Sequence, residues 1–127
     1  MPDDLRRFIL TSIQSVPFVE ATLLFMGQAG LALDATTVAR RLYVSETTAS
    51  ELAAALAASG IIEPVEGAAA SWRFAPQSKD LARMLHLLAA YYSSHLIEIT
   101  DLIHSTGARK AQRFADAFKL RREKEND

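Results

Sequence analysis

Hydrophobic residues recur with helical spacing along most of the chain. Pro17 ends the first such segment, because the residue before a proline is displaced from the helical region. A second helix, starting at Ser15 or Val16 with Pro17 in its first turn, runs to a stop at Gly27 and Gly30. The apolar stripe of the first segment, positions 3–16, consists of Leu5, Phe8, Ile9, Ile13 and Val16.

Two shorter helices follow, each opened by a capping residue. Asp34 caps a helix over 35–42, and Ser45 caps a helix over 46–59. Gly60 comes directly after the second helix, in the position where a left-handed residue commonly ends a helix. The face that we expect this second helix to bury carries Leu52, Ala55 and Leu56.

A hairpin and two further helices complete the pattern. Residues 61–65 and 71–74 read as two short strands joined by a turn. Ser78 caps a long helix that continues to about Ser105, and a helical period resumes over 108–124. The chain is therefore mainly α-helical with one small β-hairpin.

The stretch 37–62, TVARRLYVSETTASELAAALAASGII, resembles the helix-turn-helix of bacterial winged-helix regulators. A short helix ends in a leucine, Val44 fills a tight turn, and Gly-Ile-Ile leads into the hairpin as it would into a wing. With its terminal helices, the chain is similar to MarR-like transcription regulators, in which such helices form the dimer. The resemblance implies a winged helix-turn-helix with an extra N-terminal helix and a long C-terminal dimerisation helix.

A chain of 127 residues is expected to form one domain. Within it we expect an N-terminal helix, a winged helix-turn-helix, a long dimerisation helix and a basic amphipathic tail, at residues 1–16, 17–76, 77–106 and 107–127.

The resemblance implies that helix 46–59 enters the major groove of double-stranded DNA. Its base contacts would come from Thr47, Thr48 and Ser50, and its phosphate contacts from Arg40, Arg41 and Arg73. The composition of the helix disagrees, because it holds no Arg, Lys, Asn or Gln, the residues that make the strongest base contacts. Glu46 and Glu51 would also repel phosphates, and relatives that bind DNA commonly place a basic residue near the position of Glu51. The leading prediction is a dimeric DNA-binding transcription regulator, and the alternative is a winged-helix module that binds a partner protein and not DNA.

The charge distribution is uneven and bears on this choice. Residues 1–105 hold seven Lys or Arg and eleven Asp or Glu, a net charge of −4, whereas residues 106–127 hold seven and four, a net charge of +3. An acidic body is not typical of a strong nonspecific DNA binder, because phosphate affinity grows with the number of neutralised charges. In the tail, basic residues flank an apolar face that fits a partner protein, an anionic surface, DNA phosphate or the protein's own dimer. The face consists of Ala111, Phe114, Ala115 and Phe118.

The helix over 78–105 carries leucines and other apolar residues four and three apart, a pattern typical of a helix–helix seam. Its apolar surface exceeds what a small winged domain covers, so we expect a second subunit to cover the rest. This predicts a homodimer, with Phe8 or Ile9 of the first helix also contributing. The expected interface residues are Leu85, Leu88, Tyr92, Ile99 and Leu102.

Catalytic and metal-binding patterns are missing from the sequence. There is no cysteine and no glycine-rich phosphate loop. His86, His95 and His104 are nine residues apart, so successive rings would point to opposite sides of a helix, although His95 is a candidate for pH-sensitive packing. We therefore expect no enzyme, no metal and no cofactor. A small-molecule effector site near Trp72 and Tyr91 stays open.

The N-terminus, Met-Pro-Asp-Asp, lacks the basic residues of a secretory signal. No apolar run approaches the length of a membrane span. We expect a cytoplasmic protein.

Overall fold

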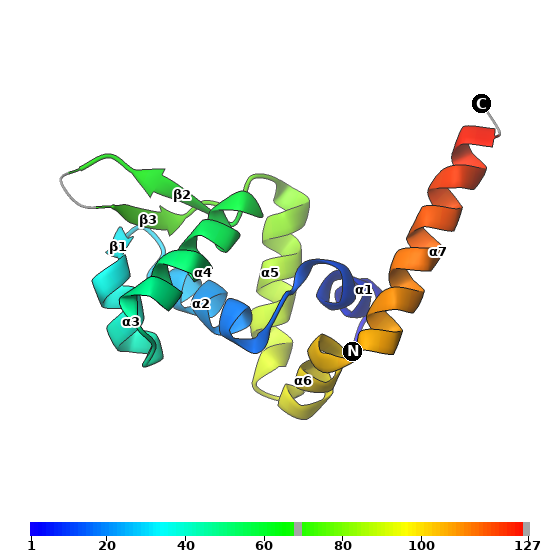
Figure 1. Cartoon of the computed structure of the whole chain (residues 1–127), viewed down its shortest axis with the longest axis horizontal. Helices are drawn as coiled ribbons and strands as arrows, with labels where there is room; N and C mark the ends of the chain where they lie inside the picture. Colours follow the sequence, from blue (N-terminus) through cyan, green and yellow to red (C-terminus); the bar gives the residue numbers. More distant parts are fainter. Residues whose placement is uncertain (68–69, 126–127) are drawn as a thin grey trace.

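The computed structural model describes residues 1–67 and 70–125, with side chains through Lys119 (Figure 1). The described part is predominantly helical, with a small antiparallel sheet. Ala68 and Ala69 of the hairpin turn, and the side chains of Arg121, Arg122 and Lys124, lie outside the described residues. The elements are α1 (Asp3–Ser12), α2 (Val16–Gly27), β1 (Leu33–Asp34), α3 (Ala35–Leu42), α4 (Glu46–Ala58), β2 (Ile62–Val65), β3 (Ser71–Phe74), α5 (Lys79–Tyr92), α6 (Leu96–His104) and α7 (Thr106–Glu125).

The sheet has the order β1-β3-β2 and all its neighbours are antiparallel. The predicted hairpin is confirmed as β2 and β3, in which Glu63 lies opposite Arg73. The two-residue strand β1 was not predicted, and it pairs Leu33 with Trp72. A strand this short is defined by its partner and carries no alternating pattern of its own.

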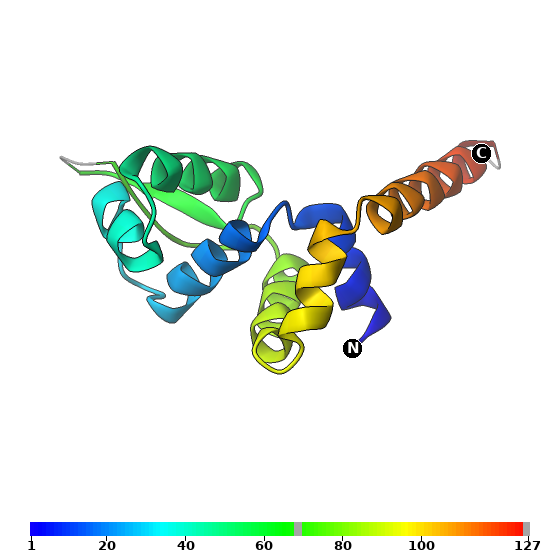
Figure 2. The ribbon, with the colours of Figure 1, turned by 60° about the horizontal axis from the view of Figure 1, so that its bottom comes forward.

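The helices fall into two groups that share one core (Figure 2). α2, α3 and α4 pack with the sheet, whereas α1, α5 and α6 pack against one another. Side chains from both groups are fully buried in this core, among them Phe18, Phe25, Leu56, Leu85 and Ile99. α7 lies against α1 and α6 at its first turns and then projects away from the body (Figures 1 and 2).

The predicted helix starts are confirmed by their capping hydrogen bonds. The side-chain oxygens of Ser15, Asp34, Ser45 and Ser78 each accept a bond from a backbone N–H in the first turn of the helix that follows. Gly60 ends α4 with a φ of 75°, and the Ile61 N–H donates to the Leu56 carbonyl at 3.0 Å. A Cβ at Gly60 would also overlap the side chain of Gln77.

The prediction of a single long helix over 78–105 is wrong, because the helix is interrupted between Tyr92 and Leu96. The Ser94 hydroxyl donates to the Tyr91 carbonyl at 3.3 Å, and His95 leaves the helical region at φ −126° and ψ 35°. A serine that bonds the backbone competes with the helical ladder. α6 therefore folds back beside α5, and the two halves of the apolar stripe face a common core. The first helix is also shorter than predicted, since it ends at Ser12.

Within the described residues, no single helix is long and apolar enough to cross a membrane. By length and composition alone, one bent pair could do so, namely α1 and α2, which meet at 112°.

Candidate functional site

The outer face of α4 is the first candidate site. Its inner face is made of small residues, with Ala49, Ala53 and Leu56 buried against α2, α3 and β2. The alanines permit close approach of neighbouring helices, so the remaining face stands outward. This outer face, toward the N-terminal half of the helix, carries the exposed residues Glu46, Thr47, Ser50 and Glu51.

The three residues predicted to contact bases do not share one environment. Thr47 and Ser50 are exposed and available to a partner. Thr48 is half-buried, and its hydroxyl accepts a bond from the Ser45 hydroxyl at 3.0 Å while its backbone N–H donates to the same Ser45 oxygen. Thr48 therefore serves the cap of α4. The Glu46 carboxylate is engaged as well, since it accepts from the Thr36 hydroxyl at 3.0 Å.

The three residues predicted to contact phosphate also differ in their surroundings. Arg40 and Arg41 are exposed in the last turn of α3, and neither forms an ion pair within the described residues. Arg73 pairs with Glu63 across the hairpin, with its Nη2 and Nε atoms both 2.8 Å from Oε1. The carboxylate neutralises Arg73 locally, which weakens its role as a phosphate contact.

Sequence reasoning missed Tyr43 at the turn between α3 and α4. Its φ of 58° places it in the left-handed region, and its side chain is 95% exposed. Left-handed backbone is uncommon for an aromatic residue, and the tight turn between the two helices requires it here. Tyr43 is the C-cap of α3 and lies between Arg40 and Arg41 and the start of α4 in the chain.

Asp34 caps the N-terminus of α3 with its carboxylate. Its side chain accepts the backbone N–H of Thr37 at 2.8 Å, and this bond, helped by the Thr37 side chain and the charge of Arg40, lowers the pKa of the carboxyl. Asp34 is thus a capping residue that stays ionised at neutral pH.

The residues predicted for the dimer interface lie mostly inside the single chain. Leu85, Leu88 and Ile99 are 0% exposed, because α1, α5 and α6 pack against one another. Tyr92 and Leu102 are half-buried; burial, with a smaller contribution from the charge of Glu20, raises the pKa of Tyr92. The sequence predicts a second subunit because the apolar area looks uncovered, but α6 folds back beside α5, and Leu85, Leu88 and Ile99 are covered within one chain.

The three histidines do not gather. Among the described residues, no group of three His, Cys, Asp or Glu side chains is placed to hold a metal. His95 packs at the helix break, where its ring lies 5.0 Å from that of Tyr91 and its Nδ1 lies 2.9 Å from the Ser94 hydroxyl oxygen. Its contacts are therefore local.

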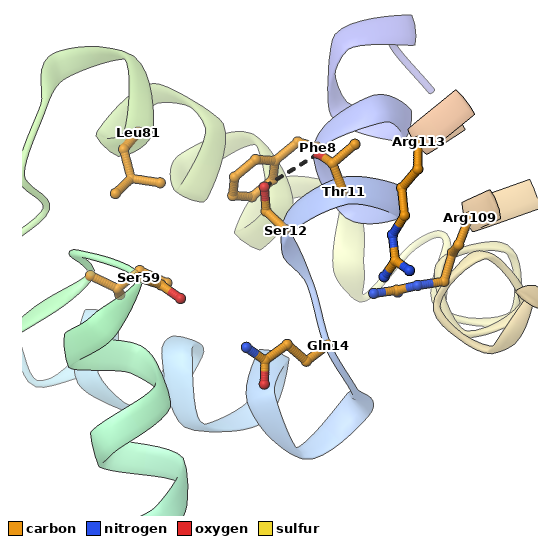
Figure 3. Close-up of a pocket in the computed structure, with 9 residues that line it drawn as sticks. Phe8, Thr11, Ser12, Gln14, Ser59, Leu81, Arg109 and Arg113 are labelled. Atoms are coloured by element: carbon orange, nitrogen blue, oxygen red, sulfur yellow. Dashed lines mark hydrogen bonds between the residues drawn. The ribbon is translucent and has the colours of Figure 1, made fainter. Parts of the chain in front are cut away.

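A cavity of about 440 Å³ opens between α1, α5, the end of α4 and the start of α7 (Figure 3). Trp72 and Tyr91, near which the sequence leaves a small-molecule effector site open, are not among its lining residues. Arg109 and Arg113 both extend into it (Figure 3), and the described residues that line it include no carboxylate. Its other walls are Phe8, Thr11, Ser12, Gln14, Ser59, Ile61 and Leu81.

Arg109 also anchors α7 to the body. Its Nη1 donates to the Ile13 carbonyl at 2.6 Å and to the Ile103 carbonyl at 3.3 Å, so one guanidinium satisfies the ends of two helices. Arg7 adds an ion pair to Asp116 at 2.5 Å. The spacing of basic residues in the tail gave no signal that distinguished this anchor from its neighbours.

No protein-family model matches the sequence, and none of the curated proteins matches it. Among solved structures, the chain is similar to the crystal structure of RV1404 from Mycobacterium tuberculosis, with a TM-score of 0.52 and 11% identity. The alignment covers 91% of this chain and 83% of that chain. At this identity the likeness concerns the fold alone.

Proposed function

We propose that this chain is a winged helix-turn-helix protein of the MarR-like type that acts as a dimeric DNA-binding transcription regulator. The arrangement of elements supports the fold: α3 and α4 form the helix-turn-helix, and β2 and β3 form a wing closed by β1. A helical body with a three-stranded antiparallel sheet is compatible with this class. The similarity in fold to RV1404 adds support for the architecture only.

The observation that carries the functional proposal is the polar outer face of α4. Thr47 and Ser50 stand exposed on the first turns of a helix whose other face is buried on alanines. In a helix-turn-helix these turns enter the major groove and their side chains meet base edges. Arg40 and Arg41, at the end of α3, would hold the backbone on one side of the groove.

The acidic residues make the proposed regulator a weak and selective binder of DNA. Glu46 and Glu51 flank the hydroxyls, and Arg73 is occupied by Glu63. Arg40 and Arg41 form no ion pair in the part of the chain that the structure describes. A dimer that uses both arginines of each chain makes four phosphate contacts, which correspond to a salt slope of about −3.6. Because it makes few phosphate contacts, its nonspecific affinity is low and falls with rising salt less steeply than that of a protein with about 6–10 such contacts.

The test is fluorescence anisotropy with duplexes from the region upstream of its own gene. Wild type should bind at low salt, and Arg40→Ala with Arg41→Ala should weaken binding to all sequences and flatten the salt slope. Lys79→Ala, which removes an exposed cation on α5, is the matched control and should leave both unchanged. Absence of binding even at low salt would rule out the regulator.

A second candidate function is a winged-helix module that binds a partner protein and not DNA. The observation that favours it is the exposed acid of α4 and the hairpin, namely Glu46, Glu51, Glu63 and Glu66. A flat DNA titration together with a partner retained by wild type, and lost when Glu46 and Glu51 are replaced by Gln, would establish this function.

The cavity beside α7 supports a small anionic ligand for the regulator. Two guanidinium groups without a lining carboxylate favour a carboxylate or phosphate, and Phe8 and Leu81 offer apolar walls. A panel of aromatic and aliphatic carboxylates should raise the Tm of wild type by mass action. Arg113→Ala should abolish the rise, whereas Lys110→Ala should not. A panel without effect on wild type would remove this ligand class.

A further inference from the structure

The projecting helix α7 has two opposite faces with different tasks. Arg109, Arg113 and Asp116 point to the body, where they form the contacts and the cavity described above. At 100° per residue, the apolar positions fall on the opposite side of the helix. This outer face, called here the arm face, consists of Ala111, Phe114, Ala115 and Phe118.

The arm face is exposed and aromatic. Phe114 is 74% exposed and Phe118 is 53% exposed, and their rings stack with centroids 6.4 Å apart. Lys110 and Lys119 flank the aromatic pair, and neither forms an ion pair within the described residues. The face is thus an apolar stripe with positive edges.

A second exposed apolar patch lies at the turn between α5 and α6, called here the corner. Leu96 is 48% exposed and Ile97 is 78% exposed, beside a shallow groove of about 640 Å³. Glu98 and Asp101 border the same groove, are exposed, and form no ion pair within the described residues. The corner is thus an apolar patch with negative edges.

We propose that the arm face of one chain docks on the corner of a second copy, and that the contact is made twice in a closed dimer. The inference rests on the dimer of the proposed function and names its interface. In one chain α7 runs away from the turn between α5 and α6 (Figures 1 and 2), so the arm does not reach its own corner. A two-fold partner presents the corner to the arm and the arm to the corner.

Charge complementarity selects a second copy as the occupant. Lysines of the arm face meet carboxylates of the corner, while aromatic rings meet aliphatic side chains. Of the six large hydrophobic side chains exposed among the described residues, four belong to these two surfaces. An aromatic side chain buries at most about 150–250 Å², so the four rings of two reciprocal contacts supply no more than about 600–1,000 Å². Leu96 and Ile97 of each corner add apolar area, which brings the total toward the lower limit of about 1,200 Å² for a stable interface.

The contacts that anchor α7 to the body lower the entropic cost of this docking. Arg109 and the pair formed by Arg7 and Asp116 fix the direction of the arm before a partner binds. A prearranged binding element loses less conformational freedom on association than a flexible tail.

The test is a charge swap followed by mixing, read by sedimentation velocity on the full chain without DNA. An arm variant carries Lys110→Glu with Lys119→Glu, and a corner variant carries Glu98→Lys with Asp101→Lys. Each alone places like charges at both contacts, and each should weaken the dimer at least tenfold. Mixed in equal amounts, the two variants should recover a heterodimer, because both of its contacts are matched.

The control is Glu51→Lys with Glu66→Lys, the same change in charge as in the corner variant but placed on α4 and the hairpin, and it should leave the dimer unchanged. Circular dichroism of each variant verifies that the body stays folded. A monomeric wild type at tens of micromolar, or swapped variants that dimerise as wild type does, would overturn the proposal. So would a monomer that instead binds vesicles of anionic lipid. DNA binding is measured separately, so its failure leaves this result standing.

Discussion

Replacement of Leu88 by alanine tests the placement of α5 in the core of a single chain. Leu88 is 0% exposed and belongs to the core cluster that both helix groups share. Truncation of a fully buried leucine costs about 3–5 kcal/mol through lost transfer energy and the cavity left behind. For a domain of this size that loss lowers Tm by roughly 10–20 °C.

The assay is thermal unfolding followed by circular dichroism over two orders of magnitude in protein concentration. If Leu88 packs within one chain, the difference in Tm between Leu88→Ala and wild type stays constant on dilution. If Leu88 lies in a subunit seam, the difference shrinks as the dimer dissociates.

The matched control is Leu31→Ala, because Leu31 is 57% exposed. Its loss should stay within about 1 kcal/mol. An effect of Leu88→Ala as small as that of the control, or one that disappears at low concentration, would refute the core placement.

Three further changes test other parts of the structure. Gly60→Ala should cost at least about 1 kcal/mol, because alanine is strained at positive φ, while Gly27→Ala, which meets open space, should be near neutral; equal urea midpoints would contradict this. The pKa of Asp34 is lowered below its ordinary value of 3.8, so the stabilisation by its carboxylate is present above that pH and is lost as pH falls through the lower, folded pKa. Asp34→Asn keeps a cap without a charge, and it should therefore flatten the loss of stability in acid. An unchanged acid profile would argue against the cap. Glu63→Gln frees Arg73 and should steepen the salt slope of DNA binding by about 2 in a dimer, a change that an unaltered slope would exclude.

Local signals in the sequence predict much of the fold. The caps Ser15, Asp34, Ser45 and Ser78 are recognisable because a short polar side chain precedes each apolar period. Gly60 and the hairpin are predictable for a similar reason, because the backbone conformation at each depends on residues that are close in the sequence. These elements form where the sequence places them.

Other features depend on distant partners and could not be predicted locally. The stripe of α5 and α6 has a regular period, but whether α1, a second subunit or its own continuation covers it depends on the break at Ser94 and His95. A pair of serines is a weak break signal within an apolar run. The element that covers Leu88 therefore becomes known only from the three-dimensional structure.

The candidate site shows the same division. Thr47, Ser50 and Arg40 stand exposed, as the helix-turn-helix pattern predicts. The pairing of Arg73 with Glu63 follows from the hairpin register, which places them opposite one another; the sequence fixes that register only once the turn is known. Arg109 lies within a run of basic residues, and only the meeting of α1, α6 and α7 separates it from them.

The most direct test of the proposed function is a map of backbone amide shifts during titration with duplex DNA from the protein's own upstream region. If α4 enters the groove, the amides of Thr47 and Ser50 should shift most, followed by those of Arg40 and Arg41 at the end of α3. The amides of Leu96 and Phe114 report on the dimer contacts and should not move. Shifts confined to the arm face or the corner, or no shifts at all at low salt, would contradict DNA recognition by α4.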